Sequence, residues 1–272
     1  MSDRSEKRGR EITSLTNATV KAVRALHMRK ERDATGLFLA EGLKFIGEAL
    51  DQGRVPRTLL VGWEARPHPL LERAKAETKA AGGEIVLVSH PILEKISRRE
   101  NPQTVLGVFE QAYAPLSSLL PASAPCWVAL EQVRDPGNLG TIIRTADAAG
   151  CGGVILIGDC CDPYSVEAVR ATMGSVFAVA VARATATEFL AWREGWPGSV
   201  IGTRLDAVTG YREAAIQTPA LILMGNEQAG LTDELAAACD VNVKIPMRGR
   251  ADSLNLAVAT GIMIYAATDQ AV

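Results

Sequence analysis

The sequence predicts an α/β protein in two parts, a small α/β domain followed by a larger domain built on a parallel sheet. Three observations predict this fold class. The chain has 272 residues, more than the roughly 100 to 200 of a single domain. Short apolar segments of strand length alternate with helical stretches along the chain. In the second half these segments are apolar throughout, which is typical of parallel strands covered by helices on both faces.

The composition indicates a folded protein whose two halves differ in charge. Hydrophobic residues make up 47% of the chain and charged residues 22%, the balance of a globular protein rather than a disordered one. The net charge of −2 excludes a strong overall field of the kind that marks nucleic-acid or membrane binders. Residues 1–120 nevertheless carry 19 basic and 15 acidic side chains, whereas residues 121–272 carry 10 and 16.

The first part of the chain begins with a basic tail, residues 1–16, followed by the small domain, residues 17–113. A basic helical stretch at Lys21–Lys30 opens this domain. Its other elements alternate, with strands at 38–42, 57–62, 84–89 and 104–110 and helices at 43–52, 69–81 and 91–97. Residues 114–125 hold three prolines and three serines, so we expect them to form a linker.

The larger domain is expected over residues 126–272. Six apolar segments predict its strands: WVALEQV, GVILIG, VFAVAVA, SVIGTR, ALILMG and VNVKIP. The apolar stretch Leu254–Ala267 is too short to span a bilayer, which takes about 20 residues, and the polar N-terminus is no secretory signal. The five cysteines form no C-x-x-C pair, and no histidine stands at metal-ligand spacing. We therefore expect a cytoplasmic protein without a membrane segment, a disulfide framework or a metal site.

The first segment that carries chemistry is DPGNLGTIIRTADAAG, residues 135–150. It follows a strand and begins with a turn, and its apolar residues recur at helical spacing. Asn138 lies near the start of this helix and Arg144 within the next two turns. An amide and a guanidinium there suit a phosphate or ribose site. An ordinary capped helix with an exposed arginine explains the same residues equally well.

The second segment is LILMGNEQAGL, residues 221–231, in which an apolar strand ends in Gly225, Asn226 and Glu227. Polar residues at the carboxyl edge of a strand lie where open α/β sheets bind their ligands. Glycine-ended strands are common, so this segment alone is a weak indication.

The third segment, residues 245–267, runs from a strand end through a glycine loop into a helix expected to begin near Ser253. Asp252 or Ser253 can cap that helix. Asn255 then falls inside an otherwise apolar helix start. A buried asparagine needs hydrogen-bond partners, so we expect Asn255 to face a site.

Two missing motifs narrow the class of enzyme. The chain has no G-x-x-x-x-G-K-[ST] phosphate loop and no G-x-G-x-x-G after a strand. Kinases, dinucleotide-dependent oxidoreductases and the usual Rossmann-type methyltransferases are therefore disfavoured.

Together and in this order, the three segments resemble the SpoU (TrmH-like) family of RNA 2′-O-methyltransferases, within the SPOUT class. The resemblance covers about residues 125–268. The basic helix, FLAEG and NPQTVLGVF also resemble the small substrate-binding domain that many members carry in front. The resemblance implies S-adenosylmethionine as cofactor, a C-terminal trefoil knot and a homodimer. It implies RNA as the substrate, with ribosomal RNA ahead of transfer RNA, and the alternative is an inactive RNA-binding or ribosome-associated homologue of the same fold.

The resemblance also implies residue roles. Asn138 and Arg144 match the first family motif, Glu227 the second, and Ser253 and Asn255 the third, so these five are the candidate catalytic residues. An arginine stays protonated in proteins, so the preferred role of Arg144 is to bind the adjacent phosphate and stabilise a developing alkoxide. Glu227 is the alternative proton acceptor.

The cofactor pocket of such proteins is formed largely by the backbone of the knot loops. This implies six cofactor-binding residues: Thr203, Leu205, Gly225, Ile245, Met247 and Leu254. Arg248 and Arg250 depart from the pattern, because they add positive charge beside a cofactor whose sulfonium is already cationic. RNA phosphate is the other candidate partner of this pair.

Overall fold

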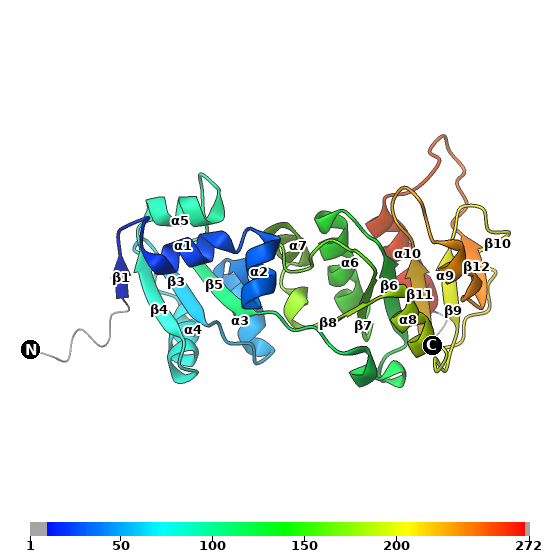
Figure 1. Cartoon of the computed structure of the whole chain (residues 1–272), viewed down its shortest axis with the longest axis horizontal. Helices are drawn as coiled ribbons and strands as arrows, with labels where there is room; N and C mark the ends of the chain where they lie inside the picture. The colour runs from blue at the N-terminus through cyan, green and yellow to red at the C-terminus, as the bar shows by residue number, and fades with distance from the viewer. Residues whose placement is uncertain (1–9, 270–272) are drawn as a thin grey trace, which may run out of the picture. The chain divides into compact units, whose positions relative to one another are not determined.

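The computed structural model describes residues 10–269, so residues 1–9 of the predicted basic tail lie outside it. The chain divides into two compact units (Figure 1). Unit one contains the chain up to Gln111 together with Tyr164–Phe177, and unit two contains Ala112–Pro163 and the chain from Ala178 onward. The return of Tyr164–Phe177 to unit one is a feature that the sequence did not predict.

Unit one is built on a five-stranded mixed sheet in the order β1-β4-β3-β5-β2. The strands are β1 (Arg10–Ile12), β2 (Leu37–Glu41), β3 (Thr58–Gly62), β4 (Glu84–Val88) and β5 (Val105–Glu110). β1, β4 and β3 are parallel, and β5 runs antiparallel to both β3 and β2. The helices are α1 (Ala18–Ala25), α2 (Arg29–Thr35), α3 (Leu43–Asp51), α4 (Pro69–Ala80), α5 (His90–Ser97) and the returning α7 (Val166–Thr172). The predicted alternation of strands and helices is confirmed.

The predicted single helix over Lys21–Lys30 is wrong, because the chain breaks between α1 and α2. Met28 has an extended backbone, with φ −93° and ψ 129°. The buried guanidinium of Arg32 donates to the carbonyl oxygen of Leu26 at 2.7 Å. A side chain thus satisfies a carbonyl at the end of α1 that a continuing helix would have paired.

The returning segment is anchored in unit one by aromatic packing and a buried ion pair. The ring of Phe38 lies 4.7 Å from that of Tyr164, and the ring of Phe109 lies 4.9 Å from that of Phe177. Arg170 on α7 donates to both carboxylate oxygens of Glu41 at 2.8 Å, and the Glu41 side chain is only 3% exposed. A buried carboxylate of this kind needs its partner, because losing one member leaves an uncompensated charge.

Unit two contains a fully parallel seven-stranded sheet in the order β10-β12-β9-β11-β6-β7-β8. The strands are β6 (Cys126–Glu131), β7 (Gly153–Ile157), β8 (Ala180–Ala184), β9 (Val200–Thr203), β10 (Thr209–Gly210), β11 (Ala220–Met224) and β12 (Val241–Lys244). The predicted parallel sheet is confirmed. The strand predicted from VFAVAVA is displaced, because Val176 and Phe177 form a 3₁₀ turn in unit one.

Helices cover both faces of this sheet, as the continuously apolar strands predicted. The helices are α6 (Pro136–Ala148), α8 (Ala186–Arg193), α9 (Asp233–Ala237) and α10 (Leu256–Asp269). Successive β6 residues enter different cores: Val128 packs in the core that contains α6 and α10, and Trp127 in the core that contains α8 and α9. This alternation follows from the pleat of a strand. Because the neighbouring strands β6, β11, β9 and β12 are parallel, their carboxyl ends lie along one edge of the sheet, where their following loops meet.

Candidate functional site

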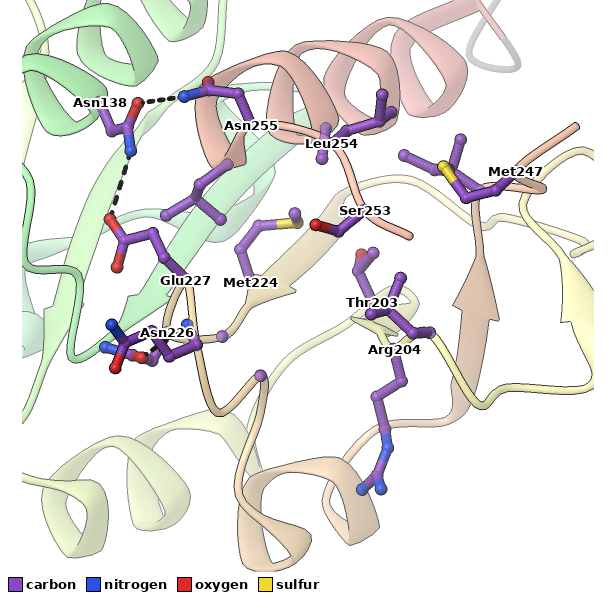
Figure 2. A pocket seen from close by; sticks show the side chains of 17 residues that line it. Asn138, Thr203, Arg204, Met224, Asn226, Glu227, Met247, Ser253, Leu254 and Asn255 are labelled. Carbon is purple, nitrogen blue, oxygen red and sulfur yellow. Dashed lines mark hydrogen bonds between the residues drawn. The ribbon is translucent and has the colours of Figure 1, made fainter. Parts of the chain in front are cut away.

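The loops that follow β9, β11 and β12, together with the first turn of α6, enclose a cavity of about 290 Å³ in unit two (Figure 2). Parallel α/β sheets bind ligands at this edge, and an apolar cavity with a few convergent polar groups is the usual form of such a site. Ten of the eleven residues predicted from the sequence line it: Asn138, Thr203, Leu205, Gly225, Glu227, Ile245, Met247, Ser253, Leu254 and Asn255.

A chain of hydrogen bonds at the cavity joins the three sequence motifs. Asn138 donates through Nδ2 to Glu227 Oε1 at 3.3 Å, and Asn255 donates through Nδ2 to Asn138 Oδ1 at 2.8 Å. The backbone N–H groups of Arg134 and Asp135 also donate to the Glu227 carboxylate, at 3.3 and 3.4 Å. Asn138 lies between the other two side chains in Figure 2. Segments that are far apart in the sequence are thus held together by their polar side chains.

Asn255 caps α10, and this corrects two expectations. Its Oδ1 accepts from the backbone N–H groups of Ala257 at 2.9 Å and Val258 at 3.3 Å, so Asn255 rather than Asp252 or Ser253 is the capping residue. The residue is also exposed rather than buried. The expectation that its side chain finds polar partners was nevertheless right, because the oxygen caps the helix while the nitrogen reaches Asn138.

Gly225 allows the loop after β11 to fold back on itself. A Cβ atom at this position would lie 2.0 Å from the backbone of both Gly230 and Leu231. Asn226 and Gly230 exchange two backbone hydrogen bonds across the loop, at 3.1 and 2.9 Å, and Gly230 has φ +71°. This tight turn points Glu227 toward Asn138, and no larger residue fits at its base.

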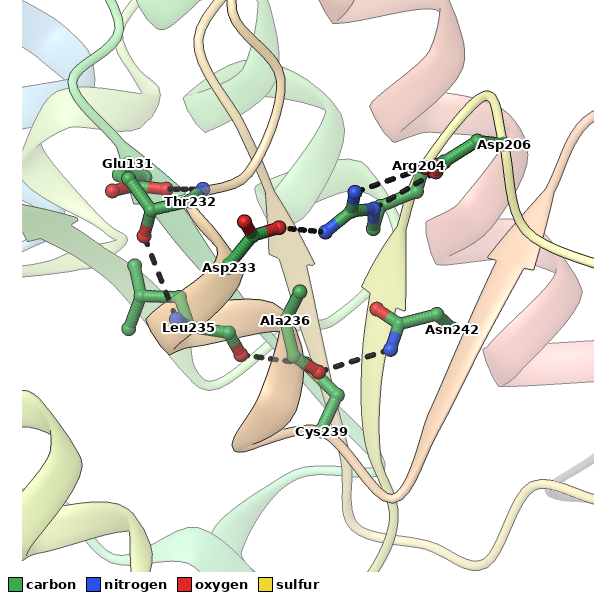
Figure 3. A network of polar contacts seen from close by, with 9 residues as sticks. All are labelled: Glu131, Arg204, Asp206, Thr232, Asp233, Leu235, Ala236, Cys239 and Asn242. Atoms are coloured by element: carbon green, nitrogen blue, oxygen red, sulfur yellow. Dashed lines mark hydrogen bonds and ion pairs between the residues drawn. The ribbon is translucent and has the colours of Figure 1, made fainter.

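Arg204 lines the cavity between Thr203 and Leu205 and was missed by the sequence analysis. Its guanidinium points away from the cavity and pairs with Asp206 and Asp233, each at 2.9 Å (Figure 3). Hydrogen bonds to the two carboxylates raise the pKa of Arg204, and its two hydrogen bonds to Asp206 lower the pKa of that carboxyl. The loop after β9 is thereby tied to the start of α9. The signal that could have identified Arg204 was its position at the carboxyl end of a strand.

Arg144 is the one predicted residue that does not line the cavity. It lies on α6, six residues beyond Asn138, which places it about 9 Å further along the helix and on a different side of it. The side chain is exposed and makes no hydrogen bond or ion pair with any residue of the described range 10–269. Within one chain, therefore, the structure brings together four of the five candidate catalytic residues and leaves Arg144 apart from them.

Neither a metal cluster nor a membrane helix is found in residues 10–269. No group of three His, Cys, Asp or Glu side chains in this range could hold a metal ion. None of its helices is long and apolar enough to cross a membrane. Burial raises the pKa of the Cys161 and Cys239 thiols to about 12, so both stay protonated at neutral pH and are poor nucleophiles.

The fold and the cavity define a class of ligand-binding α/β proteins with an all-parallel sheet, and comparison with known proteins gives the family. Residues 125–265 match the SpoU rRNA Methylase family, and residues 17–107 match the MRM3-like substrate binding domain. The chain belongs to the SpoU rRNA methylase family. The resemblance seen in the sequence motifs is confirmed.

Similar proteins cover nearly the whole chain. The 23S rRNA (guanosine(2553)-2′-O)-methyltransferase RlmP of Bacillus subtilis is 33% identical, over 94% of this chain and 98% of its own. An AdoMet-bound rRNA methyltransferase from Sinorhizobium meliloti is 49% identical, with a TM-score of 0.91 over 97% of this chain and 98% of its own. The AdoMet complex of the SpoU methyltransferase AviRb from Streptomyces viridochromogenes is 31% identical, with a TM-score of 0.84 over 94% of this chain and 98% of its own.

Proposed function

We propose that this protein transfers the methyl group of S-adenosylmethionine to a ribose 2′-hydroxyl of RNA, and that its substrate is 23S ribosomal RNA in the cytoplasm. The observation that carries the proposal is the hydrogen-bond chain Glu227–Asn138–Asn255, which joins the three family motifs at one cavity. Transfer RNA is the second candidate, because a Synechocystis relative is named as a tRNA/rRNA methyltransferase. The inactive homologue has no support, since all five motif residues are present.

The cavity suits S-adenosylmethionine on its own geometry. Met224, Ile245 and Leu256 supply apolar walls for the faces of an adenine ring. Thr203 Oγ1 is buried without a hydrogen-bond partner among the described residues, so it is available to a polar edge of a ligand. The backbones of Thr203, Leu205, Gly225, Ile245, Met247 and Leu254 would hold the cofactor, which supplies an electrophilic methyl carbon when bound.

The chain's own residues would position the ribose and receive its proton. Glu227 is fixed by three N–H donors and keeps acceptor capacity on its carboxylate, so it can accept a hydrogen bond from the hydroxyl. Arg144 stays protonated, so it would bind the adjacent phosphate and stabilise negative charge that develops on the ribose oxygen. Holding the oxygen in line with the methyl carbon supplies much of the rate.

We further propose a homodimer in which the partner subunit's Arg144 completes the cavity. The Arg144 side chain is exposed and unpaired on α6, which packs against α10. α10 carries an apolar stripe of Val258, Ile262 and Tyr265, in which Val258 is 53% exposed, Tyr265 is 48% exposed and Ile262 is half-buried. Apolar faces of this kind mark protein–protein contacts. A twofold contact through the stripe would place each α6 beside the other subunit.

The trefoil knot remains part of the proposal. β12 lies between β9 and β10 in the sheet, although both of those strands precede it in the chain. β11, which comes between β10 and β12 in sequence, pairs with the other side of β9. The insertion of a later strand between two earlier ones is a strand order that a knotted chain can have, and it supports this part of the proposal.

RNA would also bind unit one through unpaired cations on α1, α5 and the turn after α5. These exposed side chains make no hydrogen bond or ion pair within residues 10–269: Lys21, Arg24, Lys95, Arg98 and Arg99. Four of them line a groove of about 420 Å³ together with Glu94 and Glu100. His27 Nε2 lies 2.6 Å from the Ile96 carbonyl oxygen and holds α1 to α5. Clustered unpaired cations suit a phosphate backbone.

Methyl transfer to unmodified 23S rRNA transcribed in vitro tests the proposal. We expect radiolabel from S-adenosylmethionine in this RNA, at one 2′-oxygen that mapping by alkaline resistance identifies. Arg144→Ala should abolish labelling while S-adenosylmethionine affinity, measured by calorimetry, stays nearly unchanged. Labelling of 16S rRNA or transfer RNA instead would contradict the substrate, and full turnover by the variant would contradict the role of Arg144.

A further inference from the structure

Five of the nine cationic side chains of unit two have a partner within the chain, and the unit is acidic overall. Its two segments, residues 112–163 and 178–272, carry nine basic and fifteen acidic side chains. Most of the arginines have a partner: Arg134 with Asp159, Arg183 with Asp162, Arg204 with Asp206 and Asp233, Arg193 with the Ala238 carbonyl, and Arg212 over the Tyr211 ring. The remaining cations are therefore the ones available to an anion from outside the chain.

Four cationic side chains of unit two make no hydrogen bond, ion pair or ring contact with described residues, and three of them belong to one segment. Besides Arg144, they are Lys244 at the end of β12 and Arg248 and Arg250 on the loop that follows. Both arginines are exposed. The same loop has one acidic residue, Asp252, also exposed. The loop thus presents local positive charge on a unit with an acidic excess.

This loop is also part of the cavity wall. Met247 and Ser253 line the cavity, whereas Arg248 and Arg250 between them do not. The two arginines therefore lie on the rim, outside the space that would hold the cofactor. Two residues span at most about 7 Å of extended chain, so both guanidinium groups can reach neighbouring phosphates of one strand. Guanidinium groups bind phosphate through paired N–H donors.

We propose that Arg248 and Arg250 bind the RNA phosphates beside the target nucleotide and so set which ribose enters the cavity. This inference rests on the proposed function, because it takes RNA as the ligand. The competing anion is the carboxylate of S-adenosylmethionine. RNA is favoured because neither arginine lines the cavity and because two adjacent cations match a repeating anion better than a single one.

The test compares Arg248→Gln/Arg250→Gln with the wild type on the 23S rRNA transcript between about 50 and 200 mM salt. We expect kcat/KM for RNA to fall on the order of tenfold at the lower salt, through KM. The slope of log Kd against log salt, from filter binding, should fall by about 1.4, since each phosphate contact on a single strand contributes about 0.7. S-adenosylmethionine affinity by calorimetry should not change. Arg248→Lys/Arg250→Lys should retain most of the slope, because charge is conserved.

The matched control is Arg57→Gln/Arg73→Gln, which removes the same charge from exposed arginines that pair with acids in unit one. This control should keep wild-type slope and KM. An unchanged slope in the Arg248/Arg250 variant, or an equal loss in the control, overturns the inference. A tenfold weaker calorimetric affinity for S-adenosylmethionine assigns the pair to the cofactor carboxylate instead. If the wild type methylates no RNA, the proposed function fails, and filter binding of the same transcript still decides whether the arginines contact RNA.

Discussion

At the scale of single residues, Asn255 serves folding and the site through opposite ends of one amide. Its oxygen caps α10 by accepting from Ala257 and Val258, and its nitrogen donates to Asn138. An aspartate can cap a helix as well as an asparagine but has no N–H to donate. The two roles can therefore be separated by substitution.

Asn255→Ala should lower both stability and activity, whereas Asn255→Asp should lower activity alone. Loss of the cap is expected to cost about 0.5–2 kcal/mol of unfolding free energy, measured by urea denaturation. Asn255→Asp keeps the cap but replaces the donor to Asn138 Oδ1 with a carboxylate, so methyl transfer should still fall. Wild-type activity in the aspartate variant would show that the contact with Asn138 does not matter to the site.

The sequence predicts which residues belong to the site better than it predicts where their side chains point. The polar residues at the ends of strands and helices, such as Asn138, Glu227 and Asn255, were identified because their types and positions fit a ligand edge. Arg204 was missed because nothing in TRLDA indicates that its side chain turns away to Asp206 and Asp233. The position of Arg144 could not be predicted either, because it depends on which side of α6 faces the cavity.

At the scale of elements, α10 is the helix whose apolar surface is only partly buried by the rest of the chain. Its buried side, with Met263 and Ile264 fully enclosed, packs in the core with α6. The opposite stripe of Val258, Ile262 and Tyr265 recurs at helical spacing, and in the single chain Val258 and Tyr265 are exposed while Ile262 is half-buried. The periodic pattern of apolar residues predicts that a helix is apolar on two sides. It does not distinguish a side that packs in the core from a side that contacts another subunit.

Tyr265→Arg should convert the dimer to a monomer, because it replaces an exposed residue of the apolar stripe with a charge. Sedimentation equilibrium should then give a mass near 28.9 kDa instead of twice that value. Leu120→Arg, at a residue 68% exposed outside the stripe, is the matched control and should leave the mass unchanged. A monomeric wild type would refute the proposed dimer.

At the scale of the whole molecule, the chain crosses between its two units more often than the sequence suggests. The Pro- and Ser-rich stretch after residue 113 could be recognised from composition, but the return of Tyr164–Phe177 to unit one could not. That segment is held by the rings of Phe38 and Phe109 and by the Glu41–Arg170 pair. Such long-range contacts leave no local pattern in the sequence. A domain boundary drawn from the sequence alone therefore assigns these residues to the wrong unit.

Removing residues 1–111 should therefore not leave a well-behaved unit two. The deletion strips Tyr164, Val166 and Phe177 of their partners and exposes apolar surface, which favours aggregation. Replacing residues 164–177 with a short Gly/Ser linker in the same truncation should restore a soluble fragment that binds S-adenosylmethionine by calorimetry and binds RNA weakly. Equal solubility of the two fragments would show that the returning segment does not need to pack against unit one.

The assembly itself can be tested by mixing two inactive subunits. If the partner subunit's Arg144 completes each cavity, a heterodimer of Arg144→Ala and Glu227→Ala contains one cavity with both residues, formed by Glu227 of one chain and Arg144 of the other. Mixing the two variants by unfolding and refolding should then restore methyl transfer to about a quarter of the wild-type level, since about half of the dimers are mixed and each has one complete site. If Arg144 acts within its own chain, every cavity lacks one residue and mixing restores nothing. Tyr265→Arg added to both variants should abolish the recovery, which separates an effect of assembly from residual activity of either variant.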